Sequence, residues 1–139
     1  MSKIIYLDPE EGTLAVVHPT GEVPIEQLAG MVVPEGVSYE IVDDNIIPSD
    51  RTFRDAWVRT GSTISEDLAK SKEIGHEYRR LKRAEEFAPH DDVIAKQIPG
   101  ADAEAAEAAR AEIRAKYATM QADIDAATTT AQIKTTLNL

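Results

Sequence analysis

The sequence predicts an α+β protein, with a small antiparallel β module at the N-terminus and a helical hairpin or coiled-coil-like part at the C-terminus. Residues 4–42 contain short runs of Ile, Val and Leu between turns that contain Gly or Pro, which is typical of strands. Residues 64–127 place apolar side chains three and four positions apart, the period of amphipathic helices. We therefore expect a docking module over 1–58, a long and a short helix over 59–98, and a hinge with two further helices over 99–139.

The first strands are predicted at residues 4–7 and 13–18, because the five residues between them combine Pro and Gly and suit a chain reversal. Residues 24–29 read as a short helix with Pro in its first turn and Gly30 after its end. Residues 38–42 read as a third strand. Three strands and a small helix form a plausible folding unit when another layer covers them.

The run at residues 48–57, Pro-Ser-Asp-Arg-Thr-Phe-Arg-Asp-Ala-Trp, begins with a helix-entry signal. Ser49 or Asp50 can accept a hydrogen bond from the free amides of a first helical turn, and an Asp charge suits the helix dipole there. A short helix is expected, with Gly61 placed to end it.

The aromatic residues of this run are Phe53 and the only tryptophan of the chain, Trp57. In a helix they share one face because they are four positions apart, whereas Arg51 and Arg54 point elsewhere. We expect the two rings to pin the β-rich part onto the helical part, since a Phe/Trp pair at helical spacing is usually core.

A long helix is expected over residues 64–87, opened by a capping box of Thr63 and Glu66 and ended by the segment at 88–92, which contains a proline. Its apolar stripe is thin, so the helix should pack on one or two partners. Its basic residues could meet an acidic neighbour or nucleic acid, but adjacent glutamates favour a solvated, salt-bridged face. These basic residues are Arg79, Arg80, Lys82 and Arg83.

After a predicted hinge at residues 98–100, Asp102 is expected to cap an alanine-rich helix over 103–127, and Thr129 with Gln132 a short terminal helix. The long helix carries an apolar seam at intervals of four and three. The seam consists of Ile113, Tyr117, Met120, Ile124 and Ala127. It can pack on the helix at 64–87 or on another molecule. We favour another molecule, because the upstream alanines bury little surface.

Composition limits the classes of function. The chain has 139 residues, a formal net charge of −10 and no cysteine, and residues 1–50 contain ten acidic residues and one basic residue. Such a surface repels phosphate, so we expect no nucleic-acid partner, and no segment is long and apolar enough for a membrane span. The acidic head can contact a basic neighbour or simply keep the protein soluble.

No catalytic, cofactor or metal site is predicted. The three histidines are scattered, and no serine lies in a nucleophile motif, so we do not expect an enzyme. The acidic turn at 43–45 could bind a hard cation, but Asp and Asn are common in turns without one. The His-Asp-Asp segment at 90–92 could suggest a metal corner, but helix capping accounts for its Asp residues.

The run at 48–57 resembles one that recurs in small proteins of tailed bacteriophages, most of them uncharacterised, and the order of the other elements is similar. The resemblance implies a virion structural protein, made in the bacterial cytoplasm, that acts as a tail, neck or fibre-associated adaptor or decoration subunit. The alternative is an assembly chaperone for a tail or tail-fibre protein. Partners would be other phage structural proteins or further copies. The residues expected to make contacts are Arg51, Phe53, Arg54, Trp57, Ile113, Tyr117, Met120 and Ile124.

Overall fold

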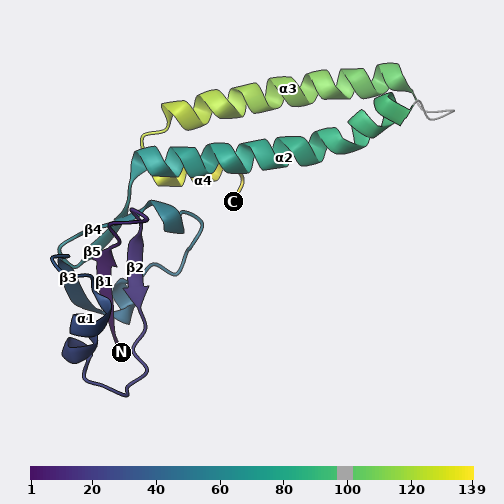
Figure 1. Cartoon of the computed structure of the whole chain (residues 1–139). Helices are drawn as coiled ribbons and strands as arrows, with labels where there is room; N and C mark the ends of the chain where they lie inside the picture. Colours follow the sequence, from purple (N-terminus) through teal and green to yellow (C-terminus); the bar gives the residue numbers. More distant parts are fainter. Residues whose placement is uncertain (97–101) are drawn as a thin grey trace. The chain divides into compact units, whose positions relative to one another are not determined.

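The computed structural model describes residues 1–96 and 102–139 and confirms the α+β class (Figure 1). The chain divides into two compact units, Met1–Lys70 and Ser71–Leu139. The boundary therefore differs from the predicted ends at residues 58 and 98, because a β-hairpin follows residue 56 and a single helix follows that hairpin. The hinge predicted at 98–100 lies outside the described residues.

The first unit contains a three-stranded antiparallel sheet with the strand order β2-β1-β3. The strands are β1 (Ser2–Leu7), β2 (Leu14–Val17) and β3 (Tyr39–Asp43), which confirms the three predicted strands. The turn between β1 and β2 is closed by the Asp8 carboxylate, which accepts a hydrogen bond from the Glu10 amide at 2.8 Å.

The two faces of this sheet are covered by different elements. Ile4 and Ile5 are adjacent in β1, so their side chains lie on opposite faces, and both are fully buried. The helix α1 (Ile25–Val32) contacts β1 and buries Ala29. The helix runs through Gly30, which was predicted to lie after its end; glycine lowers helix stability by only about 1 kcal/mol.

The segment after β3 differs most from the prediction. Instead of a helix through Trp57 it forms two 3-10 turns, η1 (Asp44–Ile46) and η2 (Arg54–Ala56), and then a hairpin of β4 (Trp57–Thr60) and β5 (Thr63–Glu66). Gly61 does not end a helix; it lies in the hairpin turn with a φ of 58°. Valine, threonine and isoleucine around a Thr-Gly-Ser turn are strand formers, and this signal is the one that the helix prediction overlooked.

Trp57 belongs to the core of the first unit. It packs with Ile5, Leu14 and Val42, with Val16, Ile47 and Ile64 at the margin of this cluster. The expectation that the tryptophan pins the β-rich part onto the helical part was therefore wrong as to its partners, which are all residues of the β-rich unit. Burying so large a ring supplies much of the apolar area that a small unit needs.

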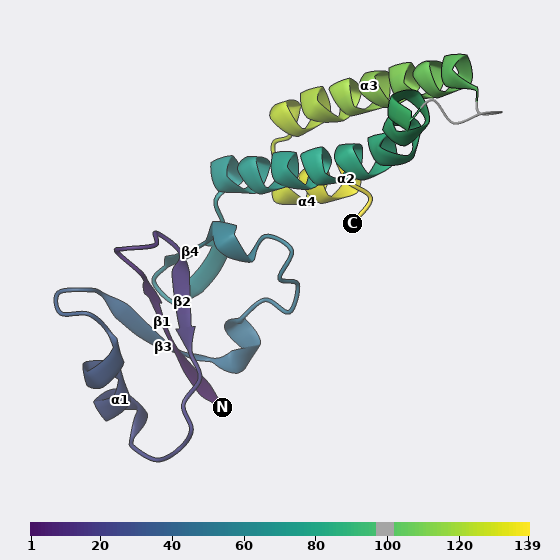
Figure 2. The same ribbon diagram turned by 45° about the vertical axis from the view of Figure 1, so that its right-hand side comes forward.

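The long helix α2 extends from Leu68 to Lys96 and starts later than predicted. Thr63 and Glu66 are in β5, and the first turn is capped instead by Asp67, whose carboxylate accepts a hydrogen bond from the Lys70 amide at 2.9 Å. Pro89 does not end the helix. Both views show α2 bending towards its C-terminal end, where a proline removes one backbone hydrogen bond without stopping the helix (Figures 1 and 2).

The remaining helices are α3 (Ala103–Ala126) and α4 (Thr130–Thr136), in the predicted places. Asp102 caps α3 by accepting from the Ala105 amide at 3.0 Å, and Thr129 caps α4 by accepting from the Gln132 amide at 3.2 Å. In both views α3 runs along α2, and α4 lies against the beginning of α2 (Figure 2). The predicted helical hairpin is thus formed within the chain.

Small residues allow the helices of the second unit to approach closely. Ser71 and Gly75 are buried in α2, and a β-carbon at Gly75 would meet side chains of Ile133 and Ile124. Ile124, Ile133 and the following Leu137 are all fully buried. No helix in the described part of the chain is long and apolar enough to cross a bilayer.

Candidate interaction surfaces

The run at 48–57 builds a covered aromatic site. Asp50 Oδ1 accepts hydrogen bonds from the amide and hydroxyl of Thr52, at 3.0 and 2.7 Å, which fixes the turn that leads into η2. The guanidinium carbon of Arg54 lies 4.7 Å from the centre of the Trp57 ring, and that of Arg51 lies 5.9 Å from it. Two cations over one indole form cation–π contacts.

These contacts cover the Trp57 ring, so that a partner protein cannot reach it. Trp57 is 0% exposed and Phe53 2% exposed, so neither of these predicted contact residues offers its ring at the surface. Burial, followed by the nearby Arg51 charge, lowers the pKa of Arg54. Of the four residues expected to make contacts here, Arg51 is exposed and Arg54 is partly buried. The run is therefore a folding element of the first unit, with an arginine surface above it.

The predicted seam of α3 also lies inside the protein. Tyr117, Met120 and Ile124 are buried in the second unit, and Ile113 is partly buried. The expectation that this seam docks on another molecule was wrong, because α2 and α4 of the same chain cover it. The sequence signal that could have shown this is the pair of small residues Ser71 and Gly75, which permit close packing without long apolar side chains.

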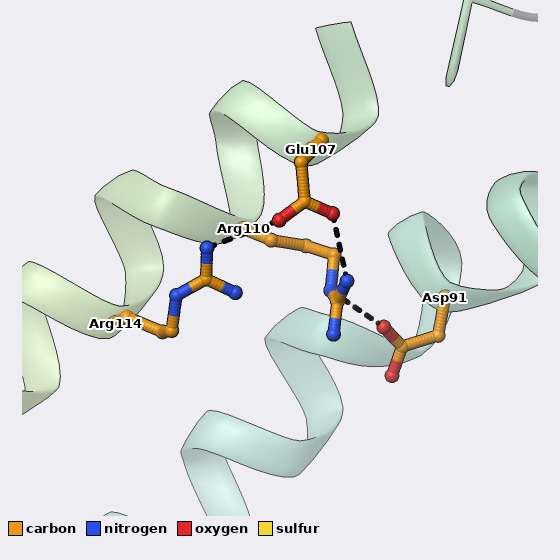
Figure 3. Close-up of polar contacts among 4 residues, drawn as sticks. All are labelled: Asp91, Glu107, Arg110 and Arg114. Atoms are coloured by element: carbon orange, nitrogen blue, oxygen red, sulfur yellow. Dashed lines mark hydrogen bonds and ion pairs between the residues drawn. The ribbon is translucent and has the colours of Figure 1, made fainter. Parts of the chain in front are cut away.

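Charged side chains form the contact between the C-terminal part of α2 and the N-terminal part of α3. Arg110 forms an ion pair with Asp91 at 2.9 Å and another with Glu107 at 2.8 Å, and Glu107 also pairs with Arg114 at 3.1 Å (Figure 3). Asp91, which the sequence offered as a helix cap or metal corner, is thus the partner of an arginine. Of these pairs, only the one between Arg110 and Asp91 crosses from α3 to α2, and its side chains are partly exposed, so it orients the helices more than it stabilises them.

A second polar contact lies beside the buried ring of Tyr117. Lys116 Nζ donates to Glu86 at 2.7 Å, and this hydrogen bond, followed by that from Tyr117, lowers the pKa of Glu86. Burial, followed by the Glu86 carboxylate, raises the pKa of Tyr117 to about 12. The folded protein therefore holds the phenol proton more tightly than an exposed tyrosine does.

The predicted basic face of α2 is only partly a solvated surface. Arg79 is 7% exposed, and its Nε donates to His76 Nδ1 at 3.3 Å, while His76 Nε2 lies 2.8 Å from Asp125 of α3. Burial lowers the pKa of Arg79. Lys82 donates to the Leu137 carbonyl at 2.9 Å. Of the four basic residues, Lys82 therefore bonds directly to another part of the helical unit, and Arg79 is buried against His76, which contacts α3; helical spacing alone did not reveal either role.

An open surface hollow of about 490 Å³ lies where α2 bends beside α3. Its lining mixes acids, bases and apolar carbon, and it consists of Glu86, Pro89, His90, Ala109, Glu112, Ile113 and Lys116. Ile113 is the one predicted seam residue that reaches this surface. Within this lining, Lys116 and Glu86 form an ion pair at 2.7 Å.

The first unit exposes several large apolar side chains. Met31 is 68% exposed, Tyr39 40% and Leu7 43%. Tyr39 lies on β3, an outer strand of the sheet. None of these residues was among the predicted contact residues; for Tyr39, exposure depends on which strand becomes the sheet edge.

Nothing in residues 1–96 or 102–139 forms a group of three or more His, Asp or Glu residues suited to a metal ion. The acidic turn at 43–45 is used locally, since Asp43 accepts from the Asn45 amide at 3.1 Å and Asp44 pairs with the N-terminal amine at 3.6 Å. Comparison with known proteins identifies no relative: no family model, no curated protein and no solved structure matches this chain.

Proposed function

We propose that this protein is a structural component of a tailed-phage virion, an adaptor or decoration subunit that acts through protein–protein contacts. The phage assignment rests on the resemblance of the run at 48–57. Because that run supplies Phe53 and Trp57 to the core of the first unit, proteins that share it are expected to share this unit as a fold, with their partner-specific residues elsewhere on its surface.

The observation that supports an adaptor role is the separate construction of the two units. The first has its own core and still exposes Met31 and Tyr39, whereas the second covers its apolar seam with its own helices. Large exposed apolar side chains on a small acidic unit suit a protein partner better than a small-molecule substrate. Docking through the first unit leaves the helical unit as a spacer or a second contact surface.

The position in the particle is tested by peptide mass spectrometry of density-purified virions of the encoding phage. An adaptor or decoration subunit is retained at a fixed ratio to the tail proteins after a second gradient. A non-structural enzyme from the same infected cells, followed in parallel, should be lost between the two gradients. Retention of this chain with loss of the enzyme supports the proposal.

The outcome that contradicts the proposal is also specific. An assembly chaperone for a tail or tail-fibre protein would be absent from finished virions and would co-purify with that protein from infected cells before particle release. Absence from both fractions would argue against both roles. Both roles require the same folded first unit, so the structure does not distinguish them. The presence of the protein in virions or in the cell extract does.

A further inference from the structure

The outer edge of β3 carries free backbone groups at defined positions. The Asp44 amide donates to the Met1 carbonyl at 2.9 Å, so in the ladder between β1 and β3 the bonded pairs also include Lys3 with Val42 and Ile5 with Glu40. The backbone amides and carbonyls of the intervening residues of β3 point away from β1. These residues are Tyr39, Ile41 and Asp43, and within the described part of the chain no strand pairs with their outward amides and carbonyls.

This edge has few of the features that usually prevent strand addition, although two of its five residues, Glu40 and Asp43, are charged. β3 contains neither lysine nor proline, and its register with β1 runs unbroken from Ser2 opposite Asp43 to Tyr6 opposite Tyr39. The opposite edge is different, because β2 contacts β4 and its outward residue Leu14 is fully buried. Tyr39 is 40% exposed, and it shares a face of β3 with Ile41, so an added strand would find apolar side chains beside it.

The net charge of the first unit indicates which kind of added strand this edge would attract. The first unit contains thirteen acidic and five basic residues, and no lysine or arginine occurs between Lys3 and Arg51. Glu40 lies on β3 itself. The cations nearby are Lys3, which pairs with Val42 from the inner strand β1, and Arg59, whose guanidinium donates to the Ser38 hydroxyl at 2.7 Å and the Gly61 carbonyl at 2.8 Å. A second copy would bring like charges together at this edge, whereas a basic segment would bring opposite charges.

We propose that the outer edge of β3 binds an extended, lysine- or arginine-containing segment of another protein by strand addition. The backbone of Tyr39, Ile41 and Asp43 supplies the hydrogen bonds, the face of Tyr39 and Ile41 receives an apolar side chain, and Glu40 on the other face receives a cation. This inference takes from the proposed function only that the partner is a protein.

The probe is a blocked heptapeptide of alternating Lys and Val, with an alternating Glu and Val peptide as its matched control. Amide exchange is followed by NMR on the full chain. At a peptide concentration about ten times the dissociation constant, exchange at Tyr39, Ile41 and Asp43 should slow roughly tenfold. Exchange at Glu40 and Val42, which already bond to β1, should change little. The acidic peptide should bind about tenfold more weakly or worse.

Two variants separate strand addition from general attraction. Ile41→Pro removes an outward amide without removing a bond to β1 and should abolish the protection, provided that circular dichroism and Trp57 emission show a folded unit. Glu40→Lys retains the backbone and should weaken binding of the basic peptide roughly two- to fivefold. Glu10→Lys, with the same charge change in the turn between β1 and β2, should weaken it less.

Equal affinity for the two peptides, protection at β2 instead of β3, or no binding would overturn the inference. So would undiminished protection in a folded Ile41→Pro protein. Raising salt to about half molar should weaken binding of the basic peptide, because the screening length falls to a few ångströms. None of these results depends on recovery of the protein in virions. The strand-addition inference can therefore be wrong while the virion proposal is right, and the virion proposal can be wrong while the inference is right.

Discussion

Gly75 and Ile133 are in such close contact that a β-carbon added to Gly75 would lie 2.7 Å from Cγ2 of the isoleucine. Ile133 is fully buried in the first turn of α4, a helix whose start is capped by Thr129, so it has little room to move away. The approach of α4 to α2 therefore depends on a residue without a side chain. It gives the helical unit a packing contact that neither the apolar stripe of α2 nor the seam of α3 contains.

Gly75→Ala is expected to destabilise the protein. The helix gains about 1 kcal/mol in propensity, but overpacking against Ile133 typically costs about 1–3 kcal/mol. The matched control is Gly30→Ala in α1, where a β-carbon meets nothing within 4 Å and only the propensity gain remains. Denaturant melts of both variants measure the difference. A Gly75→Ala protein more stable than the wild type would show that α4 is not held as described.

Trp57→Ala is expected to lower the free energy of unfolding of the first unit by roughly 3–5 kcal/mol, because it empties the centre of the Ile5, Leu14 and Val42 cluster. Tyr39→Ala, at a partly exposed ring, should change it by no more than about 1 kcal/mol. Wild-type tryptophan emission should be blue-shifted. Emission like that of free tryptophan in water would contradict the burial of this ring.

Ile124→Asp is expected to lower the melting temperature without changing the mass in solution, because Ile124 is covered by helices of its own chain. A carboxylate at this fully buried position should cost roughly 3–5 kcal/mol, and Ile113→Asp should cost less because Ile113 is only partly buried. Leu81→Asp, at a side chain that is 65% exposed, is the control.

Thermal melts and light scattering on these aspartate variants decide where the seam packs. Dissociation of an oligomer with an unchanged melt would mean that the seam contacts another copy, as the sequence alone had favoured. Dissociation in the Leu81→Asp control would instead point to the exposed face of α2.

Tyr117 is expected to make stability depend on pH at the alkaline end. Its pKa is raised to about 12 in the folded protein, from 10.0 in an exposed phenol, so the folded state holds the proton more tightly. The resulting stabilisation is complete below about pH 10 and is lost as the pH rises through about 12. Tyr117→Phe should remove this part of the decline, whereas loss of lysine charge in the same range affects both proteins.

Ultraviolet absorbance of the phenolates gives the measurement for Tyr117. The wild type should show one tyrosine that ionises late, and the phenylalanine variant should lack it. Absence of a late-ionising tyrosine in the wild type would contradict the burial of Tyr117 and its contact with Glu86.

Short-range signals in the sequence were sufficient for much of the fold. The caps at Asp102 and Thr129 and the strands around the turn at Asp8 depend on residues only a few positions away, and all of them form as predicted. The burial of Tyr117, Met120 and Ile124 on one stripe followed from helical spacing in the same way.

Tertiary structure decided what these elements touch. Trp57 starts a strand rather than ending a helix, because its neighbours Ile5, Leu14 and Val42 are brought together only by the sheet. Likewise, the α3 seam is covered within the chain because Gly75 of α2 leaves room for Ile124 of α3 and Ile133 of α4. Local spacing specifies which face of an element is apolar. Which surface covers that face, and which strand is left at a sheet edge, is decided by contacts between distant residues.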